Sequence, residues 1–291
     1  MKTFDAIVLI YNPKSTNDAK SKAEDFKSSL KKIGYTAKLS PTDHRGHAQE
    51  IAHSIVAKHV RPLIISVSGD GGYNEVINGV MDAQHKHPTC KPVVAVIGAG
   101  NANDHKRLTR GETPLIKLIK KAKPKPLDLI KLSTKGVHRY AHSYIGLGIT
   151  PEVGIELNKH ELSFFKELGI VIRTFRNFKP FEVMIDGEKK KLGSLVFANV
   201  NGMAKVLKLS RHETLNDGKF DIVRLPYHGT GRLLLDMSLM AIRAKRAPTA
   251  QRYKFYSISR LPVQLDGEIE YIAAHSEVLV ESVKDAVDSL Y

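Results

Sequence analysis

Between residues 66 and 79 the chain reads Ser66-Val67-Ser68-Gly69-Asp70-Gly71-Gly72-Tyr73-Asn74-Glu75-Val76-Ile77-Asn78-Gly79. The apolar run Leu63-Ile64-Ile65 before it predicts a buried strand, and the apolar spacing from Val76 to Met81 predicts a helix. The glycines between them carry no Cβ, so a phosphate can approach the backbone N–H groups at the helix start. The stretch therefore predicts a strand, a phosphate-binding turn and a helix.

The carboxylate of Asp70 is the unusual part of this turn. An acid repels phosphates unless a cation lies between them, which favours a metal-bound nucleotide as the ligand. Asp70 is equally suited to cap a helix in an ordinary tight turn. The spacing by itself leaves both interpretations open.

The composition of the 291 residues limits the class of protein. Hydrophobic residues make up 42% of the chain, which is enough for real cores, and the length favours two domains. The single cysteine, Cys90, excludes an internal disulfide and fits a reducing cytosol. No apolar run suits a signal peptide or a membrane span, so we expect a cytoplasmic protein.

The net charge of +15 favours polyanionic partners, such as phosphate compounds or an anionic membrane face. Nucleic acid is not expected as a partner. The sequence contains no zinc finger or RNP signature, it has no Trp, and aromatic residues make up only 7%.

The first 125 residues alternate between strand-like and helix-like patterns. Helical apolar spacing fills the gaps between four predicted strands, Ala6–Ile10, Thr36–Leu39, Leu63–Val67 and Val93–Ile97. This order predicts an α/β domain with a parallel sheet, residues 1–125, whose ligands bind at the carboxyl ends of the strands. Each strand ends in a polar or glycine-rich loop, and four loops at one edge would form a single site.

The pattern changes after Ala122–Pro126, which we predict to be a linker because prolines end helices and resist strands. Residues 126–280 are expected to form a mostly antiparallel β-rich domain. For residues 281–291, the prediction leaves open a return to the first domain. Two helices are predicted in it, around Phe164–Phe178 and Leu233–Ile242. The predicted strands are Phe181–Ile185, Leu195–Val200, Phe220–Leu225, Leu261–Leu265 and Glu277–Val280.

Asp-Gly pairs are first of all hairpin turns. Asp266 is predicted to depart from this use, because Gln264 and Asp266 lie opposite the apolar side of their strand, with Glu268 two residues on. Two carboxylates at a strand end can deprotonate a hydroxyl. Asp186-Gly187-Glu188 has the same letters, and spacing does not choose between the two sites.

Six ordered motifs together resemble the catalytic family of diacylglycerol kinases, which includes bacterial lipid kinases, sphingosine kinases and ceramide kinases. The motifs are Tyr11-Asn12-Pro13-x-Ser15, Thr42 with Gly46-His47-Ala48, Ser68–Gly79, Ala95–Asp104, Leu127-Asp128 with Leu215–Phe220, and Leu265–Glu268. Three positions depart from the family's pattern. Gly72 replaces Thr or Leu, Gly98 replaces proline, and Asn101 replaces Thr or Ser.

The resemblance implies an ATP- and Mg²⁺-dependent lipid kinase with a nucleotide domain and a lipid domain. It implies nucleotide contacts from Asn12, Ser15, Thr42, Ser68, Gly69, Asp70, Gly71, Gly72, Asn74, Glu75, Gly100, Asn101 and Asn103. It also implies a magnesium–water network at Asp70, Asp104 and Asp128, and a second, structural magnesium site at Asp217 with the carbonyls of Thr214 and Lys219.

The same resemblance implies that Asp266 and Glu268 act together on the lipid hydroxyl, and it selects Asp266 over Asp186. With Asp70 they form the expected catalytic set. The expected partners are a lipid alcohol, an anionic membrane surface that the protein contacts peripherally, and a second copy of the chain as a homodimer.

A basic rim around the apolar helix Leu233–Ile242 is a candidate contact with anionic lipid. Its members are Arg232, Arg243, Lys245, Arg246 and Arg252, with Lys189–Lys191, Lys205 and Lys208 nearby in sequence. Alternatively, this helix packs on the sheet and its charges are solvated. Two other functions remain open, phosphorylation of a soluble substrate in the manner of NAD kinase, and non-catalytic binding of nucleotide or membrane.

Overall fold

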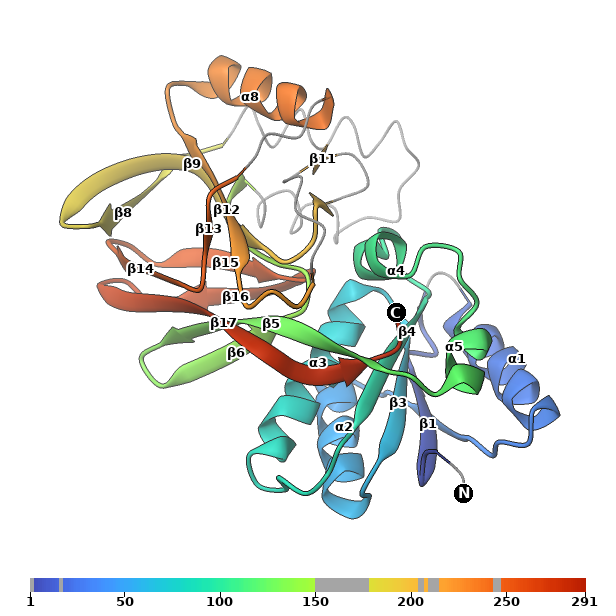
Figure 1. The fold of residues 1–291 in the computed structure, drawn as a ribbon. Helices are drawn as coiled ribbons and strands as arrows, with labels where there is room; N and C mark the ends of the chain where they lie inside the picture. The colour runs from blue at the N-terminus through green and yellow to red at the C-terminus, as the bar shows by residue number, and fades with distance from the viewer. Residues whose placement is uncertain (1–2, 16–17, 150–177, 204–206, 209–214, 243–246) are drawn as a thin grey trace. The chain divides into compact units, whose positions relative to one another are not determined.

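The computed structural model describes residues 3–15, 18–149, 178–203, 207–208, 215–242 and 247–291 (Figure 1). The chain divides into two compact units. The first contains Met1–Leu129 and Lys284–Tyr291, and the second contains Ile130–Val283. The domain boundaries that we predicted from the sequence are 125/126 and 280/281.

A parallel sheet forms the centre of the first unit. Its neighbouring strands are β2 (Lys38–Pro41), β1 (Ala6–Tyr11), β3 (Pro62–Ser68) and β4 (Val93–Gly98). The end of β17 (Ser276–Ser289) adds another parallel strand, because Asp288 and Ser289 pair with Val93 and Val94. The predicted α/β class of this part of the chain is confirmed.

Helices cover both faces of this sheet. They are α1 (Ala19–Lys32), α2 (His47–Lys58), α3 (Asp70–Gln84), α4 (Asp104–Thr109) and α5 (Leu115–Lys121). Helices α1 and α5 lie on one face, and α2 and α3 lie on the other (Figure 1). Ala23 of α1 and Ile119 of α5 share a buried cluster with Leu9 and Ile65 of the strands, so the predicted apolar faces do pack on the sheet.

Two predictions in this unit need correction. Strand β2 begins two residues later than predicted, because its ladder is set by pairing with the end of β1, from Val8↔Lys38 to Tyr11↔Pro41. The predicted linker ends earlier than expected, since Lys125 begins strand β5 (Lys125–Thr134). Pro126 is tolerated near the start of that strand, where a missing N–H removes little from the ladder.

The second unit is built from antiparallel strands. They are β6 (Val137–Ala141), β7 (Tyr144–Gly148), β8 (Phe181–Ile185), β9 (Glu188–Ala198), β12 (Phe220–Pro226), β13 (Thr249–Ala250), β14 (Arg252–Ser257), β15 (Leu261–Leu265), β16 (Glu268–Ile272) and the first part of β17. A separate short pair is formed by β10 (Gly202–Met203) and β11 (Leu207–Lys208). The predicted antiparallel character is confirmed, and strands β8, β12 and β15 lie within one residue of their predicted bounds. Strand β9 begins seven residues before the predicted Leu195 and ends two residues before Val200, because its first part pairs with β8 across the Asp186-Gly187 turn.

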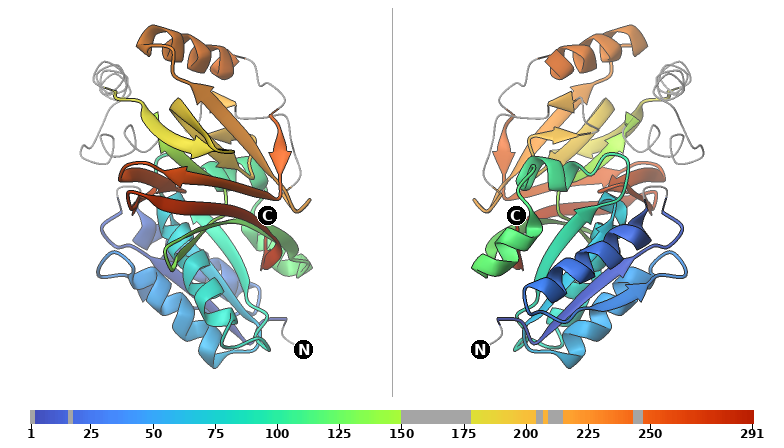
Figure 2. Two further views of the ribbon diagram at one scale, coloured as in Figure 1. Left: turned by 90° about the vertical axis from the view of Figure 1, so that its left-hand side faces the viewer. Right: turned by 90° about the vertical axis from the view of Figure 1, so that its right-hand side faces the viewer.

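Helix α8 (Thr230–Ile242) lies at the outside of the second unit (Figure 2). Its Leu233 is fully buried against Ile149 and Phe178, whereas Leu234, Leu235 and Leu239 are exposed. The other predicted helix, Phe164–Phe178, lies almost entirely outside the described residues. In the described part of the chain, no helix combines the length and apolar character needed to cross a membrane.

Gly79 sets the distance between helices α2 and α3. A Cβ at this position would lie 2.2 Å from the Gln49 carbonyl oxygen, a rigid backbone atom. We expect Gly79→Ala to lower the free energy of unfolding by about 1–3 kcal/mol, measured by urea denaturation, because the helices must separate. The control is Gly231→Ala on α8, where no heavy atom lies within 4 Å of the new Cβ. It should stabilise the protein by about 0.5–1 kcal/mol through helix propensity. Equal effects of the two changes would contradict this account.

Candidate active site

Hydrogen bonds join the loops that follow the strands of the first unit. The Ser15 Oγ–H donates to the Ala99 carbonyl at 2.9 Å, and the Ala99 N–H donates to the Ser68 carbonyl at 2.9 Å. The Thr42 N–H donates to the Tyr11 carbonyl at 2.8 Å, which ties the loop after β2 to the end of β1. The four strand-end loops therefore lie at one edge of the sheet, the usual place for a ligand of a parallel sheet.

Gly69 and Gly100 bring the loops after β3 and β4 into backbone contact. A Cβ at residue 100 would lie 2.5 Å from the Gly69 Cα, so no side chain fits there. Lys22 of α1 reaches the same edge and donates to the Gly98 carbonyl at 3.1 Å. Gly69 and Gly100 are therefore needed for the contact between these two loops, whether or not a phosphate also approaches them.

The Asp70 carboxylate caps a neighbouring helix. Its Oδ2 accepts the Asp104 N–H at 2.9 Å, and its Oδ1 accepts the His105 N–H at 3.0 Å, both at the start of α4. The N-cap of α3 itself is Gly69, which has no side chain to cap that helix. Asp70 is therefore a cap, but of α4 and not of the helix that it begins. The N–H groups in the first turn of α3 receive no side-chain cap from Gly69, as is typical of helix starts that bind anions.

Glu75 caps a second neighbouring helix in the same way. Its Oε1 accepts the Gly46 N–H at 2.9 Å and its Oε2 accepts the Ala48 N–H at 3.2 Å, at the start of α2. Two acids on α3 therefore position the two helices on either side of it in the sequence. Neither contact was foreseen, since residues 29 and 34 positions apart show no pattern that links them.

Asn103 and Asp104 are held by local contacts. Asn103 has a left-handed backbone, φ 49°, and closes the loop: its Oδ1 accepts the Gly100 N–H at 2.9 Å, and its Nδ2–H donates to the Gly100 carbonyl at 2.6 Å. Asp104 is only 1% exposed and pairs with Arg107 at 2.7 Å. Asp104 thus contacts Asp70 through its backbone N–H, and both carboxylates accept hydrogen bonds from protein groups.

The remaining predicted nucleotide residues differ in exposure. Asn12 and Asn101 are exposed, and the Asn12 Oδ1 accepts the Lys14 N–H at 2.9 Å. Asn74 is buried within α3, where its Oδ1 accepts the Asn78 Nδ2–H at 3.1 Å. Asn12 and Asn101 therefore lie at the surface, whereas Asn74 shapes the helix start from within.

Gly72 has a structural explanation. A Cβ at residue 72 would lie 2.7 Å from both the Cβ and the Oγ of Ser68. The Ser68 side chain is buried and shares a 2.7 Å hydrogen bond with the Ser66 hydroxyl. The buried serine thus occupies the space into which a larger residue at 72 would project.

Asp128, at the start of the long strand β5, binds the returning end of the chain. It is 1% exposed, and its Oδ1 accepts the Asp285 N–H of β17 at 2.7 Å. Nearby, the Tyr291 hydroxyl donates to the Pro126 carbonyl at 2.9 Å. Burial, with the carboxylates of Asp128 and Asp285, raises the pKa of the Tyr291 phenol. Asp128 therefore holds the last strand in the first unit.

In the second unit, Asp266 lies in a hairpin turn. Leu265 pairs with Glu268, and Asp266 and Gly267 both have positive φ, 49° and 100°. The prediction that Asp266 departs from hairpin use is therefore wrong, because its backbone forms the two-residue turn between β15 and β16. Its side chain is nevertheless distinctive, since Asp266 is fully buried.

The Asp266 carboxylate binds the connection between β6 and β7. Its Oδ2 accepts the His142 N–H at 2.6 Å, and its Oδ1 accepts the N–H groups of Ser143 and Tyr144 at 2.9 and 2.8 Å. The His142 imidazole lies beside it, with Nε2 3.3 Å from Oδ2. His142 and Ser143 were missed by the sequence reasoning, because no motif spacing connects them with a residue more than 120 positions away.

The two Asp-Gly-Glu sequences differ in their surroundings. Asp186 and Gly187 form a similar turn, with φ 52° and 78°, but Asp186 is exposed and Glu188 bonds with Lys190. Glu268 begins β16 and is half-buried. Burial and backbone donors thus distinguish Asp266 from Asp186, which spacing could not do.

The second predicted magnesium site is described only in part. The Asp217 Oδ1 accepts the Lys219 N–H at 3.0 Å, a local turn contact, whereas Thr214 lies outside the described residues. In the part of the chain that the structure describes, no three His, Cys, Asp or Glu side chains gather as a metal site.

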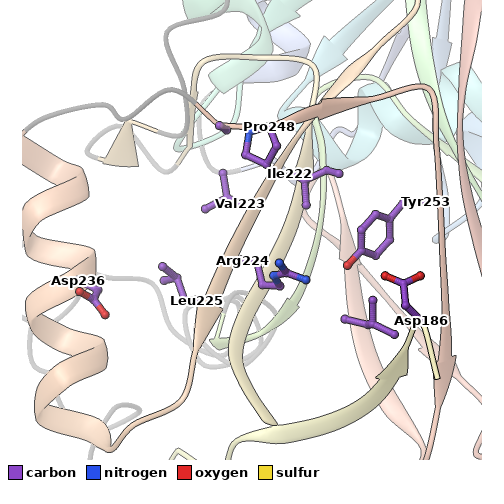
Figure 3. Close-up of a pocket in the computed structure, with 10 residues that line it drawn as sticks. Asp186, Ile222, Val223, Arg224, Leu225, Asp236, Pro248 and Tyr253 are labelled. Carbon is purple, nitrogen blue, oxygen red and sulfur yellow. The ribbon is translucent and has the colours of Figure 1, made fainter. Parts of the chain in front are cut away.

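A cavity of about 630 Å³ lies in the second unit between α8, β12 and the β8–β9 turn (Figure 3). Figure 3 shows Val223, Leu225 and Pro248 along its wall and Arg224 near Tyr253 at one end. Burial raises the pKa of the Tyr253 phenol, while the Arg224 guanidinium acts in the opposite direction. The volume falls in the range of small-molecule sites, and most of the lining is aliphatic.

The first unit has the architecture of a phosphate-binding α/β domain, with glycine-rich loops and the start of α3 at the carboxyl edge of a parallel sheet. The family model for the diacylglycerol kinase catalytic domain matches residues 6–132. Residues 6–132 belong to the diacylglycerol kinase catalytic domain family.

Relatives extend the similarity beyond this domain. The chain is 23% identical to a diacylglycerol kinase of Bacillus subtilis (strain 168), over 97% of this chain and 98% of the relative. It is 24% identical to a diacylglycerol kinase of Staphylococcus carnosus (strain TM300), over 89% and 87%. A crystal structure of a diacylglycerol kinase from Bacillus anthracis str. Sterne superposes with a TM-score of 0.72 at 19% identity, over 99% of this chain and 97% of that chain. The last comparison shows a shared fold.

The contact between Glu75 and α2 can be tested directly. We expect Glu75→Ala to lower the free energy of unfolding by about 1–2 kcal/mol, because two N–H groups at the start of α2 lose their acceptor. Amide hydrogen exchange should become faster at Gly46 and Ala48. Glu24→Ala, an exposed change on α1, is the control and should alter neither quantity. Unchanged exchange at Gly46 and Ala48 would show that Glu75 does not cap α2.

Proposed function

We propose that the protein is a lipid kinase that transfers the γ-phosphate of ATP, with Mg²⁺, to the hydroxyl of a lipid alcohol at a membrane surface. The observation that carries the proposal is the start of α3. There a glycine-rich helix N-terminus carries Asp70 within a domain of the diacylglycerol kinase catalytic family. The full-length similarity to proteins named diacylglycerol kinase supports a lipid as acceptor.

The residues present fit both ATP and magnesium. The first turn of α3 has N–H groups without a side-chain cap from Gly69, and Gly71 and Gly72 leave them open to a phosphate. The Asp70 carboxylate accepts an N–H group of α4 on each oxygen, and a carboxylate oxygen can accept more than one partner. Mg²⁺ is commonly held by one or two carboxylates, water and substrate phosphates, so Asp70 with Asp104 suits it. When bound, MgATP supplies the phosphoryl group and neutralises its charge.

We assign the predicted nucleotide residues to two roles. Asn12, Thr42, Asn101 and the backbone of residues 68–72 would contact the nucleotide. The others, Ser15, Asn74, Glu75, Gly100 and Asn103, would hold the loops and helices in place. Asp128 would support the magnesium–water network from β5, and Asp217 with the Lys219 carbonyl would contribute to a structural magnesium site.

Asp266 is the proposed base for the lipid hydroxyl, with Glu268 beside it on the same hairpin. The main-chain donors at residues 142–144 hold the Asp266 carboxylate in one orientation, which a base needs in order to meet a defined hydroxyl. The alcohol oxygen would then attack the γ-phosphorus as its proton moves to the carboxylate.

Helix α8 is the proposed contact with the membrane. Leu234, Leu235 and Leu239 are 40%, 50% and 44% exposed, and such leucines suit insertion among lipid head groups. The predicted basic rim is partly neutralised, since Arg232 pairs with Asp236, Arg252 with Glu281 and Lys189 with Glu182. Arg243, Lys245, Arg246 and Lys205 lie outside the described residues, and the side chain of Lys208 is not described either.

Transfer of labelled γ-phosphate tests the proposed function. The purified chain is given labelled ATP, Mg²⁺ and, in separate assays, vesicles with diacylglycerol, a sphingoid base or ceramide, or NAD in solution. We expect label in a lipid, and a loss of about 10²–10⁴-fold in Asp70→Asn and in Asp266→Asn. The exposed changes Asp25→Asn and Glu277→Gln are the controls and should retain the wild-type rate.

Two outcomes would overturn the lipid-kinase proposal. Label in NAD and in no lipid would establish a soluble acceptor. Binding of ATP without transfer to any acceptor would establish a non-catalytic relative. Circular dichroism of each variant checks that a lost rate is not a lost fold.

We propose that the lipid chain lies in the cavity of the second unit, against Val223 and its aliphatic neighbours. A substitution at Val223 tests this placement. Val223→Phe would fill part of the cavity. We expect the KM for lipid to rise about tenfold, equal to roughly 1.4 kcal/mol, with the KM for ATP unchanged. Val137→Phe makes the same change at a residue that is 51% exposed and should have no effect. An unchanged KM for lipid in Val223→Phe would place the chain elsewhere.

A further inference from the structure

Three buried polar side chains form a continuous line in the second unit. Ser143, His142 and Asp266 each have 0% exposure. The His142 Nδ1 lies 2.8 Å from the Ser143 Oγ, and its Nε2 lies 3.3 Å from the Asp266 Oδ2. The imidazole therefore stands between a hydroxyl and a carboxylate.

The chemistry of these neighbours assigns the hydrogens of the imidazole. An ionised carboxylate is an acceptor only, so the Nε2 that faces it carries a hydrogen. A neutral imidazole then has its lone pair on Nδ1, where the Ser143 hydroxyl donates. Ser143 thereby selects the tautomer that presents N–H to Asp266.

In the described part of the chain, two kinds of donor lie around the Asp266 carboxylate. Backbone N–H groups of residues 142–144 are held by the β6–β7 connection. The imidazole of His142 belongs to a side chain, so its orientation depends on side-chain torsions and not on the main chain alone. Oδ2 faces both the backbone N–H and the imidazole Nε2 of His142. If the imidazole turns away, the lone pair of Oδ2 that it occupied becomes available to another hydrogen.

We propose that His142 is a positioning residue for Asp266, an inference that rests on the proposed function. In the resting protein its Nε2–H orients Oδ2. When a lipid alcohol binds, the imidazole yields that lone pair. The alcohol O–H bond breaks, its proton moves to Oδ2, and the oxygen forms a bond to the γ-phosphorus as the bond to ADP breaks. The imidazole stays neutral, and Ser143 keeps its tautomer.

Nitrogen NMR of the wild-type chain tests the arrangement without any assay of activity. The spectrum should show His142 as a neutral imidazole with hydrogen on Nε2, assigned by the loss of its signals in His142→Gln. Ser143→Ala should shift the Nδ1 signal, and Asp266→Asn should shift the Nε2 signal. Hydrogen on Nδ1 in place of Nε2 would overturn the proposal.

Kinetics then separate positioning from simple packing. We expect His142→Leu to lower kcat for lipid about tenfold or more while the KM for ATP stays the same. His142→Gln, which retains an amide N–H near the position of Nε2, should recover most of kcat. Ser143→Ala, the mildest change, should lower kcat several-fold and provides the test if His142→Leu does not fold.

The outcomes distinguish this inference from the proposed function. A wild-type chain that phosphorylates a lipid, with unchanged kcat in both His142→Leu and Ser143→Ala, would overturn the role of His142 alone. A wild-type chain that transfers phosphate to no acceptor would overturn the proposed function, and the catalytic role of His142 with it. The NMR result would still establish or refute the hydrogen bonds from Ser143 to His142 and from His142 to Asp266.

Discussion

Carboxylates that bind main-chain N–H groups of distant segments hold this structure together. Buried or half-buried acids are costly unless donors surround them, and here the donors are backbone amides. Asp70 binds the start of α4, Glu75 the start of α2, Asp128 the last strand, and Asp266 the β6–β7 connection. In each case one side chain orders a second stretch of chain. The loops at the edge of the sheet inherit their shape from these contacts.

This constraint links the proposed chemistry with the fold. The acids proposed to hold magnesium and to accept the proton are the same side chains that cap helices and close turns. An acid held by two or three N–H groups has little freedom to rotate, so the main chain supplies most of its orientation. At Asp266 the proposed contribution of the His142 imidazole is added to that of the main chain. Because each carboxylate has both a structural and a proposed chemical role, a variant that loses activity can be interpreted only when its fold is checked independently.

Patterns of nearest neighbours made much of this architecture predictable. The helical spacing in α1 and α2, the alternation in β8 and the Asp186-Gly187 turn are all local, and each was placed within a few residues. The glycine-rich stretch at 69–72 and the acids at 70 and 266 were singled out by their places at strand ends, and the acid at 104 by motif order. Their partners were not, because a cap such as Asp70 on α4 depends on which loops the sheet brings together. No sequence pattern around His142 marks it as a site residue, because its proposed role depends on contact with Asp266, which is 124 positions away. Edge strand β2 was placed two residues too early, and the start of proline-containing β5 was assigned to a linker, because pairing partners and not local preference decide where these strands begin.

The long last strand has a consequence for how the protein is made. Residues 284–291 complete the first unit, although almost all of that unit is synthesised before the second one begins. During synthesis the parallel sheet lacks its final strand, and Asp128 lacks the N–H of Asp285, until residues 284–291 have been made. The second unit can be complete by then. The first unit can therefore be completed only after the whole of the second unit has been synthesised.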